Sequence, residues 1–149
     1  MSKIKMKKVM SMGSAGLFAT LAFAIFFQQN FHTIKVDGKS MEPTFKSGDH
    51  LLASKAYWLI GELRDNDIVV IEGELPGEHL IKRIYRQAGE KVDWANIPED
   101  YSMAQDEFVV PSQQVYLLGD NREVSEDSRK FGSVDKSRII GKIVLKRWL

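Results

Sequence analysis

The sequence predicts a mainly β fold preceded by an N-terminal transmembrane helix. Two observations support this prediction. An uncharged, strongly apolar stretch runs from residue 9 to residue 31. After it, short apolar runs rich in β-branched and aromatic residues alternate with Gly, Asp, Asn and Pro, the pattern of short strands joined by turns. No amphipathic helical pattern follows the apolar stretch, so the remaining chain is expected to be all-β.

Composition narrows the chemistry that this chain can perform. Its 149 residues suffice for one domain, and 44% hydrophobic residues suffice for a core. The net charge of +1 gives no basic field for nucleic acid. The absence of cysteine excludes disulfides, thiol nucleophiles and thiolate metal sites. The three histidines are scattered without ligand spacing, so we expect no metal and no cofactor, and an acid–base catalyst drawn from Lys, Asp or Glu.

The N-terminal stretch has the length and flanking charge of a membrane anchor. Residues 9–27, 19 in all, span about 28 Å as a helix at ~1.5 Å per residue, close to the ~30 Å hydrocarbon core. Four of residues 3–8 are lysines, which favours a cytoplasmic N-terminus. We therefore predict a basic cytoplasmic segment 1–8, a transmembrane helix 9–31 in the cell membrane, and an extracytoplasmic domain 32–149.

Two other interpretations of this stretch are open. A cleaved signal peptide has the same basic-then-apolar order, and Ala22-Phe23-Ala24 resembles a cleavage site. The apolar run continues past it through Ile25-Phe26-Phe27, which suits an uncleaved anchor better. A buried core helix is disfavoured because no polar face repeats along the run.

The domain that follows is predicted from alternation and turn residues, in chain order. Residues 57–60 are an apolar aromatic run that either packs in the core or dips into the membrane interface. Residues 94–105 show no period and are expected to form an exposed connection, and residues 133–138 a loop or short helical turn. The expected strands are 33–37, 51–53, 68–71, 79–85, one beginning within 89–92, 108–111, 115–118 and 139–145.

Ser40 lies in a conformationally restricted segment. Gly38 permits a bend or a close backbone approach, and Pro43 fixes its own φ and pushes Glu42 toward extended geometry. A hydroxyl on a fixed, tight segment is what nucleophilic catalysis requires. A solvated turn serine is the simpler interpretation of a Ser-x-x-Pro sequence taken alone.

Lys82 is the candidate base. In an extended strand Leu80, Lys82 and Ile84 share one face, so the lysine lies among apolar side chains. Desolvation lowers the pKa of an amine, which would let Lys82 accept the Ser40 proton. A lysine that extends to solvent, or one that protects a sheet edge, is the alternative.

Several short blocks of the sequence occur in a fixed order after the N-terminal anchor. They are Ser40-Met41-Glu42-Pro43-Thr44, Gly48-Asp49, Lys82-Arg83, Gly119-Asp120-Asn121-Arg122 through Ser125, Asp127-Ser128-Arg129, and Phe131-Gly132. Together they resemble the bacterial type I signal peptidases, in which these blocks have the same order, and the likeness covers nearly the whole chain. The first block and the block from Gly119 to Arg129 are highly specific in combination, and neither would be alone.

The resemblance implies a compact antiparallel β-barrel-like catalytic domain of the signal peptidase type. It also implies a Ser40 nucleophile, a Lys82 general base and no metal. Ser125 is expected to orient the lysine, and Asp127 and Arg129 to form an ion pair that supports the loop. Residues 120–122 are expected to be structural supports.

The implied partners are the lipid bilayer and exported preproteins, cut after small residues in the pattern Ala-x-Ala. An extended substrate is expected to add to a sheet edge, with shallow apolar pockets for specificity. The residues flanking the Ser40–Lys82 pair that we expect to form those pockets are Val36, Met41, Phe45 and Ile81. The backbone N–H of Ser40 is the natural first oxyanion donor.

The chain departs from the family pattern at three places. Some members carry a hydroxyl two residues before the nucleophile, where Gly38 has none, so water, backbone or another side chain must supply the second donor. Many members have Gly-x-Pro-Gly-Asp after the lysine, where this chain has residues 86–90, Arg-Gln-Ala-Gly-Glu. The short span from Lys82 to Gly119 indicates a compact form, common in Gram-positive bacteria.

Two further functions fit parts of the sequence. A membrane-tethered scaffold or chaperone for surface-protein or pilus assembly would bind extended peptides without cutting them. Loss of the serine or lysine marks such proteins, and both are present here. A soluble, self-cleaving Ser-Lys regulator of related β-fold is disfavoured by the anchor and by the lack of a DNA-binding segment.

Overall fold

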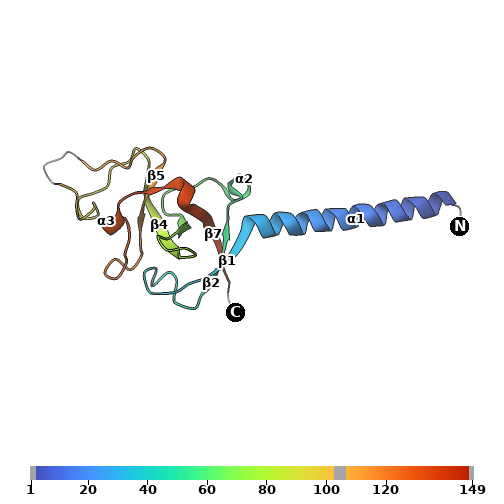
Figure 1. The fold of residues 1–149 in the computed structure, drawn as a ribbon, viewed down its shortest axis with the longest axis horizontal. Coiled ribbons are helices and arrows are strands. Elements are labelled where there is room, and N and C mark those ends of the chain that lie inside the picture. Colours follow the sequence, from blue (N-terminus) through green and yellow to red (C-terminus); the bar gives the residue numbers. More distant parts are fainter. Residues whose placement is uncertain (1–2, 103–106, 148–149) are drawn as a thin grey trace. The chain divides into compact units, whose positions relative to one another are not determined.

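The structure is a computed structural model that describes residues 3–102 and 107–147, with side chains from residue 16 onward except that of residue 147. The chain divides into two compact units, residues 1–31 and 32–149. The first is built on helix α1, Lys3–Asn30, and the second is a β domain with short helical turns (Figure 1).

Helix α1 is continuous over 28 residues. It contains no proline, and the Thr20 hydroxyl bonds back to the Gly16 carbonyl at 2.9 Å. Leu17, Phe18 and Phe23 are exposed on it. Within the described part of the chain, no helix reaches the length and apolarity that a membrane crossing needs. Residues 9–15 of the expected anchor lie outside the described side chains.

The second unit is organised by one seven-stranded sheet, in the order β1-β2-β7-β3-β4-β5-β6. The described strand pairs are antiparallel, and register shifts interrupt β2–β7, β3–β7 and β4–β5. Such bulges sharpen the twist of a sheet and let it curl around a core. The strands are β1 Phe31–Lys35, β2 His50–Ser54, β3 Ile68–Glu72, β4 His79–Gln87, β5 Gln114–Leu118, β6 Val134–Asp135 and β7 Ile139–Arg147.

Strand β4 lies between two core clusters, which decides where its side chains point. Ile81 packs into one cluster with Val70 of β3, and Ile84 packs into the other with Val69. Successive strand residues therefore face opposite sides, as the alternation predicted. A third cluster, around Tyr116 and Leu118, is covered by the chain between β4 and β5.

Three segments differ from the sequence expectation. Residues 57–60 form a helical turn, α2 Tyr57–Ile60, in which no residue is buried and Trp58 is exposed, so the core alternative is wrong and the membrane-interface alternative stays a prediction. The strands expected at 89–92 and 108–111 reduce to a single bridge between Lys91 and Val109. Backbone hydrogen bonds flank this bridge, from the Gly89 N–H to the Val110 carbonyl and from the Val92 N–H to the Phe108 carbonyl, each at 2.9 Å. Packing of Phe108 and Val92 on the third cluster adds to this short antiparallel pairing.

Two short helical elements complete the unit. Helix α3, Ser128–Phe131, was not predicted, and the Asp127 carboxylate caps it by accepting from the Arg129 N–H at 3.3 Å. The 3-10 turn η1, Lys136–Arg138, lies within residues 133–138, where a loop or helical turn was expected.

Candidate active site

Ser40 lies at the start of the loop between β1 and β2, and the loop is closed at its base. The Val36 N–H donates to the Asp49 carbonyl at 2.8 Å, and the Gly48 N–H donates to the Val36 carbonyl at 2.9 Å. Met41 is only 2% exposed and packs in the core. Gly38 adopts a φ of +90°, which side-chain-bearing residues rarely do. A buried neighbour and a bent entry therefore fix the direction of the Ser40 side chain.

Lys82 is buried in the middle of β4, 3% exposed. It pairs across the ladder with Val69, and it shares a strand face with Leu80 and Ile84, which pack in the Val69 cluster. The lysine therefore lies on an apolar face, as the alternation indicated, and does not reach solvent.

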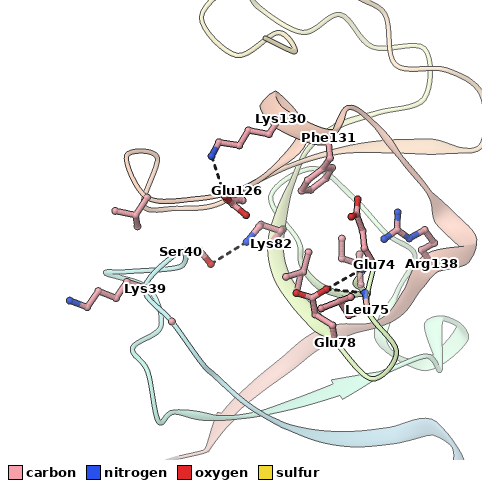
Figure 2. A pocket seen from close by; sticks show the side chains of 14 residues that line it. Lys39, Ser40, Glu74, Leu75, Glu78, Lys82, Glu126, Lys130, Phe131 and Arg138 are labelled. Carbon is pink, nitrogen blue, oxygen red and sulfur yellow. Dashed lines mark hydrogen bonds and ion pairs between the residues drawn. The ribbon is translucent and has the colours of Figure 1, made fainter. Parts of the chain in front are cut away.

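The two side chains meet. Lys82 Nζ lies 3.1 Å from Ser40 Oγ, within hydrogen-bond reach, although 42 residues separate them in the chain (Figure 2). In the protonated form the ammonium donates to the hydroxyl. In the neutral form the amine lone pair can accept the hydroxyl proton.

Burial decides which form the amine favours. Desolvation lowers the pKa of the Lys82 amine, and this outweighs the opposing pull of the Asp127 and Glu126 carboxylates. The result is a lysine that loses its proton below the usual range for an alkylamine. At a given pH, a buried amine with a lowered pKa is more often neutral, and so better able to act as a base, than an exposed lysine.

The loop after β5 holds the backbone of Ser40. The Asn121 N–H donates to the Ser40 carbonyl at 2.9 Å. Gly119 has no room for a side chain, because a Cβ there would lie 2.7 Å from the Ser40 carbonyl oxygen and closer still to the Ser125 hydroxyl. Glycine at 119 therefore lets three chain segments meet beside the Ser40–Lys82 pair.

Asp120 links this loop to β4 and to the Ser40 loop. Arg83 donates to both carboxylate oxygens, from Nε at 2.7 Å and from Nη2 at 2.6 Å. The Thr44 hydroxyl donates to the same carboxylate at 2.5 Å. Burial favours the neutral acid, but the bonds from Arg83 and Thr44 prevail and lower the pKa of Asp120. Arg83 thus fixes the loop from the strand face opposite Lys82.

Asp127 is fully buried and ionised by its partners. It accepts from Arg129 Nε at 2.9 Å, from Arg129 Nη2 at 3.0 Å and from the Gly119 N–H at 3.0 Å. Burial alone would raise the pKa of Asp127, but these bonds and the nearby Ser125 hydroxyl lower it. The expected Asp127–Arg129 ion pair is therefore present, and it holds both the α3 cap and the Gly119 backbone.

Ser125 lies where the loop passes the reacting pair. Its side chain is buried, and its N–H donates to the Asn121 carbonyl at 3.0 Å. Within the described residues, Ser125 Oγ forms no hydrogen bond of regular geometry. The hydroxyl lies near the Asp127 carboxylate, whose pKa it lowers, and the expected hydrogen bond from Ser125 to Lys82 is not formed in this structure.

Two cavities meet at Ser40 and Lys82. The first, about 830 Å³, continues between the turn that joins β3 to β4 and helix α3 (Figure 2). The second, about 670 Å³, lies between residues 33–37 and the first residues of β4. A chain passing the Ser40 hydroxyl can therefore extend in two directions.

The four residues expected to form substrate pockets are all buried in one core cluster. Three of them, Val36, Met41 and Ile81, also line the second cavity. Phe45 packs in the cluster and is not among the residues that line either of these two cavities. Among the described residues, no group of three or more His, Asp or Glu is placed to bind a metal ion.

Sequence reasoning assigned no partners to Asp120 and missed the packing role of Gly119. Alternation along the strand placed Arg83 on the face opposite Lys82, but it did not indicate which carboxylate would pair with Arg83. The contact between Gly119 and Ser125 left no sequence signal, since a glycine after a strand usually marks only a turn.

Comparison with known proteins identifies the family. The model of the family described as signal peptidase, peptidase S26, matches residues 9–98 and 95–148. Signal peptidase I T of Bacillus subtilis (strain 168) is 30% identical over 165 aligned residues, which cover 94% of this chain and 86% of that protein. Signal peptidase IB of Staphylococcus aureus (strain COL) is 28% identical over 149 aligned residues, which cover 78% of this chain and 76% of that protein.

The chain therefore belongs to the signal peptidase family, peptidase S26. This membership supports peptidase activity. A crystal structure of a signal peptidase I from Enterococcus faecalis V583 matches with a TM-score of 0.44 and 22% identity, covering 56% of this chain and 97% of that one.

Replacement of Asp120 is expected to destabilise the domain. In Asp120→Asn the bidentate, charge-assisted bonds from Arg83 are lost while the side-chain shape is kept. We expect the free energy of unfolding to fall by about 1–3 kcal/mol, measured by urea denaturation with an unchanged m value.

Glu107→Gln is the matched control, because it breaks the exposed ion pair between Lys91 and Glu107. Exposed pairs contribute less than about 1 kcal/mol. If Asp120→Asn and Glu107→Gln lower the free energy of unfolding by the same amount, the hydrogen bonds between Arg83 and Asp120 have no structural role.

Proposed function

We propose that this chain is a serine endopeptidase that removes signal peptides from exported preproteins, cutting after small residues in the pattern Ala-x-Ala. The observation that carries the proposal is the 3.1 Å approach of Ser40 Oγ to the buried Lys82 amine, in a chain of the signal peptidase family. The relatives named above are signal peptidases, which supports the choice of substrate.

The proposed reaction uses Lys82 as a proton carrier. The neutral amine accepts the Ser40 proton while Oγ attacks the scissile carbonyl carbon. The C–N bond then breaks, and the departing amine takes the proton from the Lys82 ammonium. This leaves an ester on Ser40. Water, deprotonated by the same amine, hydrolyses the ester and releases the signal peptide with a free carboxylate.

Backbone and loop groups assist in this scheme. The Ser40 N–H stabilises the oxyanion, because it is fixed on the same residue as the attacking oxygen. Gly38 offers no side-chain donor, so the second donor is a water, a backbone N–H or another side chain. Ser125, which is buried and forms no regular hydrogen bond among the described residues, is proposed to orient the Lys82 amine when substrate binds, because a flexible four-carbon stem needs such a partner.

The second cavity suits the residues before the cut. It is bordered by residues 33–37 and by His79–Lys82, and β4 pairs with β5 only from Arg83 onward in the described ladder. The first half of β4 therefore presents a strand edge to the cavity, to which an extended peptide can add. Val36, Met41 and Ile81 supply an apolar surface on which small side chains fit.

We also propose that residues 9–31 anchor the chain in the cell membrane, with residues 1–8 cytoplasmic and residues 32–149 on the outer side. The support is the uncharged run and the four preceding lysines. In Leu21→Arg/Ile25→Arg each arginine costs about 2.5–3.5 kcal/mol at a helix centre. We expect the protein to move from the alkali-resistant membrane fraction to the soluble fraction.

Trp94→Arg, which charges an exposed apolar residue of the β domain, should leave the membrane fraction unchanged. Orientation is testable because the chain has no cysteine. An impermeant maleimide added to intact cells should label Ser112→Cys and spare Ser2→Cys. Labelling in the reverse pattern, or extraction of the unaltered protein by alkali, contradicts the anchor.

Loss of either member of the pair should abolish cleavage. We expect Ser40→Ala and Lys82→Ala each to lower kcat on an Ala-x-Ala signal-peptide substrate by about 10⁴-fold or more. The double variant should be no worse than either single one, because the two groups act as a unit. The measurement is product formation in detergent, with circular dichroism to confirm the fold.

Ser47→Ala and Lys55→Ala change exposed residues of the same types and should cleave normally. Substantial residual cleavage in either active-site variant would falsify the dyad. Substrate binding without cleavage by the unaltered protein would indicate the scaffold function instead.

The pH dependence should report the Lys82 amine. Because burial lowers the pKa of this amine and its neutral form is the base, kcat/KM should rise with pH through that lowered value. The Glu126 carboxylate raises the pKa of Lys82, so Glu126→Gln should move the rising limb to lower pH. The measurement is kcat/KM across the pH range.

Glu123→Gln is the control for this shift. It removes an exposed carboxylate from the same loop that is not among the groups acting on the Lys82 pKa. A profile that is flat from acid to alkaline pH, or one that shifts equally in both variants, contradicts a neutral Lys82 as base.

A further inference from the structure

The first cavity is not explained by the binding of residues before the cut. It shares Ser40 and Lys82 with the second cavity, so the reacting atoms lie where the two meet. A polypeptide cut at Ser40 must continue on both sides of the scissile bond. If the second cavity receives the part before the cut, the first is the space left for the part that follows it.

The walls of the first cavity carry exposed apolar side chains from three segments. Leu75 is 68% exposed, Val124 56% and Phe131 37%. Single exposed apolar residues are ordinary on a surface. Here the three converge on one hollow beside a candidate nucleophile, and Figure 2 shows Phe131 and Leu75 on opposite walls of it. Such a lining fits an apolar side chain.

The two main walls are also held in place. The turn that carries Leu75 is closed by the Gly73 N–H donating to the Glu78 carbonyl at 2.8 Å. The Glu78 carboxylate accepts from the Leu75 N–H at 3.2 Å. Phe131 sits on α3, where its N–H donates to the Asp127 carbonyl at 3.2 Å. An ordered pocket binds with a smaller entropic cost than a mobile one.

The charged side chains that line the first cavity do not favour a bound side chain of either charge. Apart from Lys82, the cavity is lined by three basic and three acidic side chains, so the formal charges cancel. Lys130 and Glu126 are paired with each other at 3.2 Å. The charged residues are Lys39, Lys130, Arg138, Glu74, Glu78 and Glu126.

We propose that the first cavity is a subsite for the polypeptide that leaves, and that it selects an apolar side chain within the first three residues after the cut, between Leu75 and Phe131. This rests on the proposed function. It adds specificity on the mature-protein side of the cut.

Because the proposed reaction passes through an ester on Ser40, its kinetics separate binding on the leaving side from hydrolysis of the ester. Attack by Ser40 forms an ester with the part before the cut and expels the part after it as an amine. Substrates that differ only after the cut therefore give the same ester, which water hydrolyses at the same rate. A leaving-side subsite alters the formation of the ester and hence kcat/KM, while the hydrolysis of the shared ester stays unchanged.

The test compares detergent-solubilised full-length protein on peptides that are identical before the cut. Serines occupy the first three positions after the cut, and leucine, lysine or glutamate replaces each serine in turn. We expect leucine to raise kcat/KM at least about tenfold at one position, as a hydrophobic pocket can, with little effect of lysine or glutamate. In Leu75→Ser and Phe131→Ala the leucine preference should fall toward unity.

Two further variants serve as controls. Leu75→Met retains apolar volume and should retain the preference. Leu59→Ser changes a leucine of similar exposure, 57%, that is not among the residues lining either cavity, and should also retain it. The proposal is overturned if leucine gives no preference, if charge governs the preference, or if Leu75→Ser and Leu59→Ser behave alike.

Failure here is distinguishable from failure of the proposed function. If the subsite is wrong, the all-serine peptide is still cut and Ser40→Ala still abolishes the cut. If the function is wrong, no peptide of the series is cut through Ser40. Equal loss on every peptide in Leu75→Ser and Phe131→Ala means general damage and counts against the subsite.

Discussion

The removal of one amine from water is the constraint on which this site depends. Lys82 can be neutral only because β4 places it between apolar side chains, where an ammonium is disfavoured. The same strand sends Ile81 and Arg83 to its other face. One extended strand therefore buries the Lys82 amine on one face and, on the other, places Arg83 to bind Asp120 of the neighbouring loop.

Two carboxylates near Lys82 would spoil this arrangement if either paired with it. A direct ion pair would keep the amine protonated and weaken it as a base. Both carboxylate oxygens of Asp127 instead accept hydrogen bonds from Arg129 and from the Gly119 N–H. Glu126 pairs with Lys130 on the outside. Each acid has its own partner, so both act on Lys82 only at a distance, and burial prevails.

The burial of Lys82 could be predicted from the sequence because it follows from the alternation of side chains along one strand. Alternation in residues 79–85 placed Lys82 on an apolar face, and that face is buried. Periodicity is local information, so it survives in any fold that contains the strand. The contacts of Gly119 with Ser40 and Ser125 and the linkage of Asp120 to Thr44 span up to 79 residues and have no periodic signature. Residues 89–92 and 108–110 do pair through backbone hydrogen bonds, but the pairing is too short to form the full strands that the local pattern predicted.

The long-range contacts also tie the candidate nucleophile to the candidate base. The Asn121 N–H holds the Ser40 carbonyl, and two residues earlier the Gly119 N–H holds Asp127. Asp127 in turn contributes to the electrostatic potential at Lys82. A displacement of this loop would therefore move the hydroxyl and change the pKa of the amine together. The loop is held at two points, by the Arg83–Asp120 ion pair on one side and by the Arg129–Asp127 ion pair on the other, so both the hydroxyl and the amine depend on the same anchored segment.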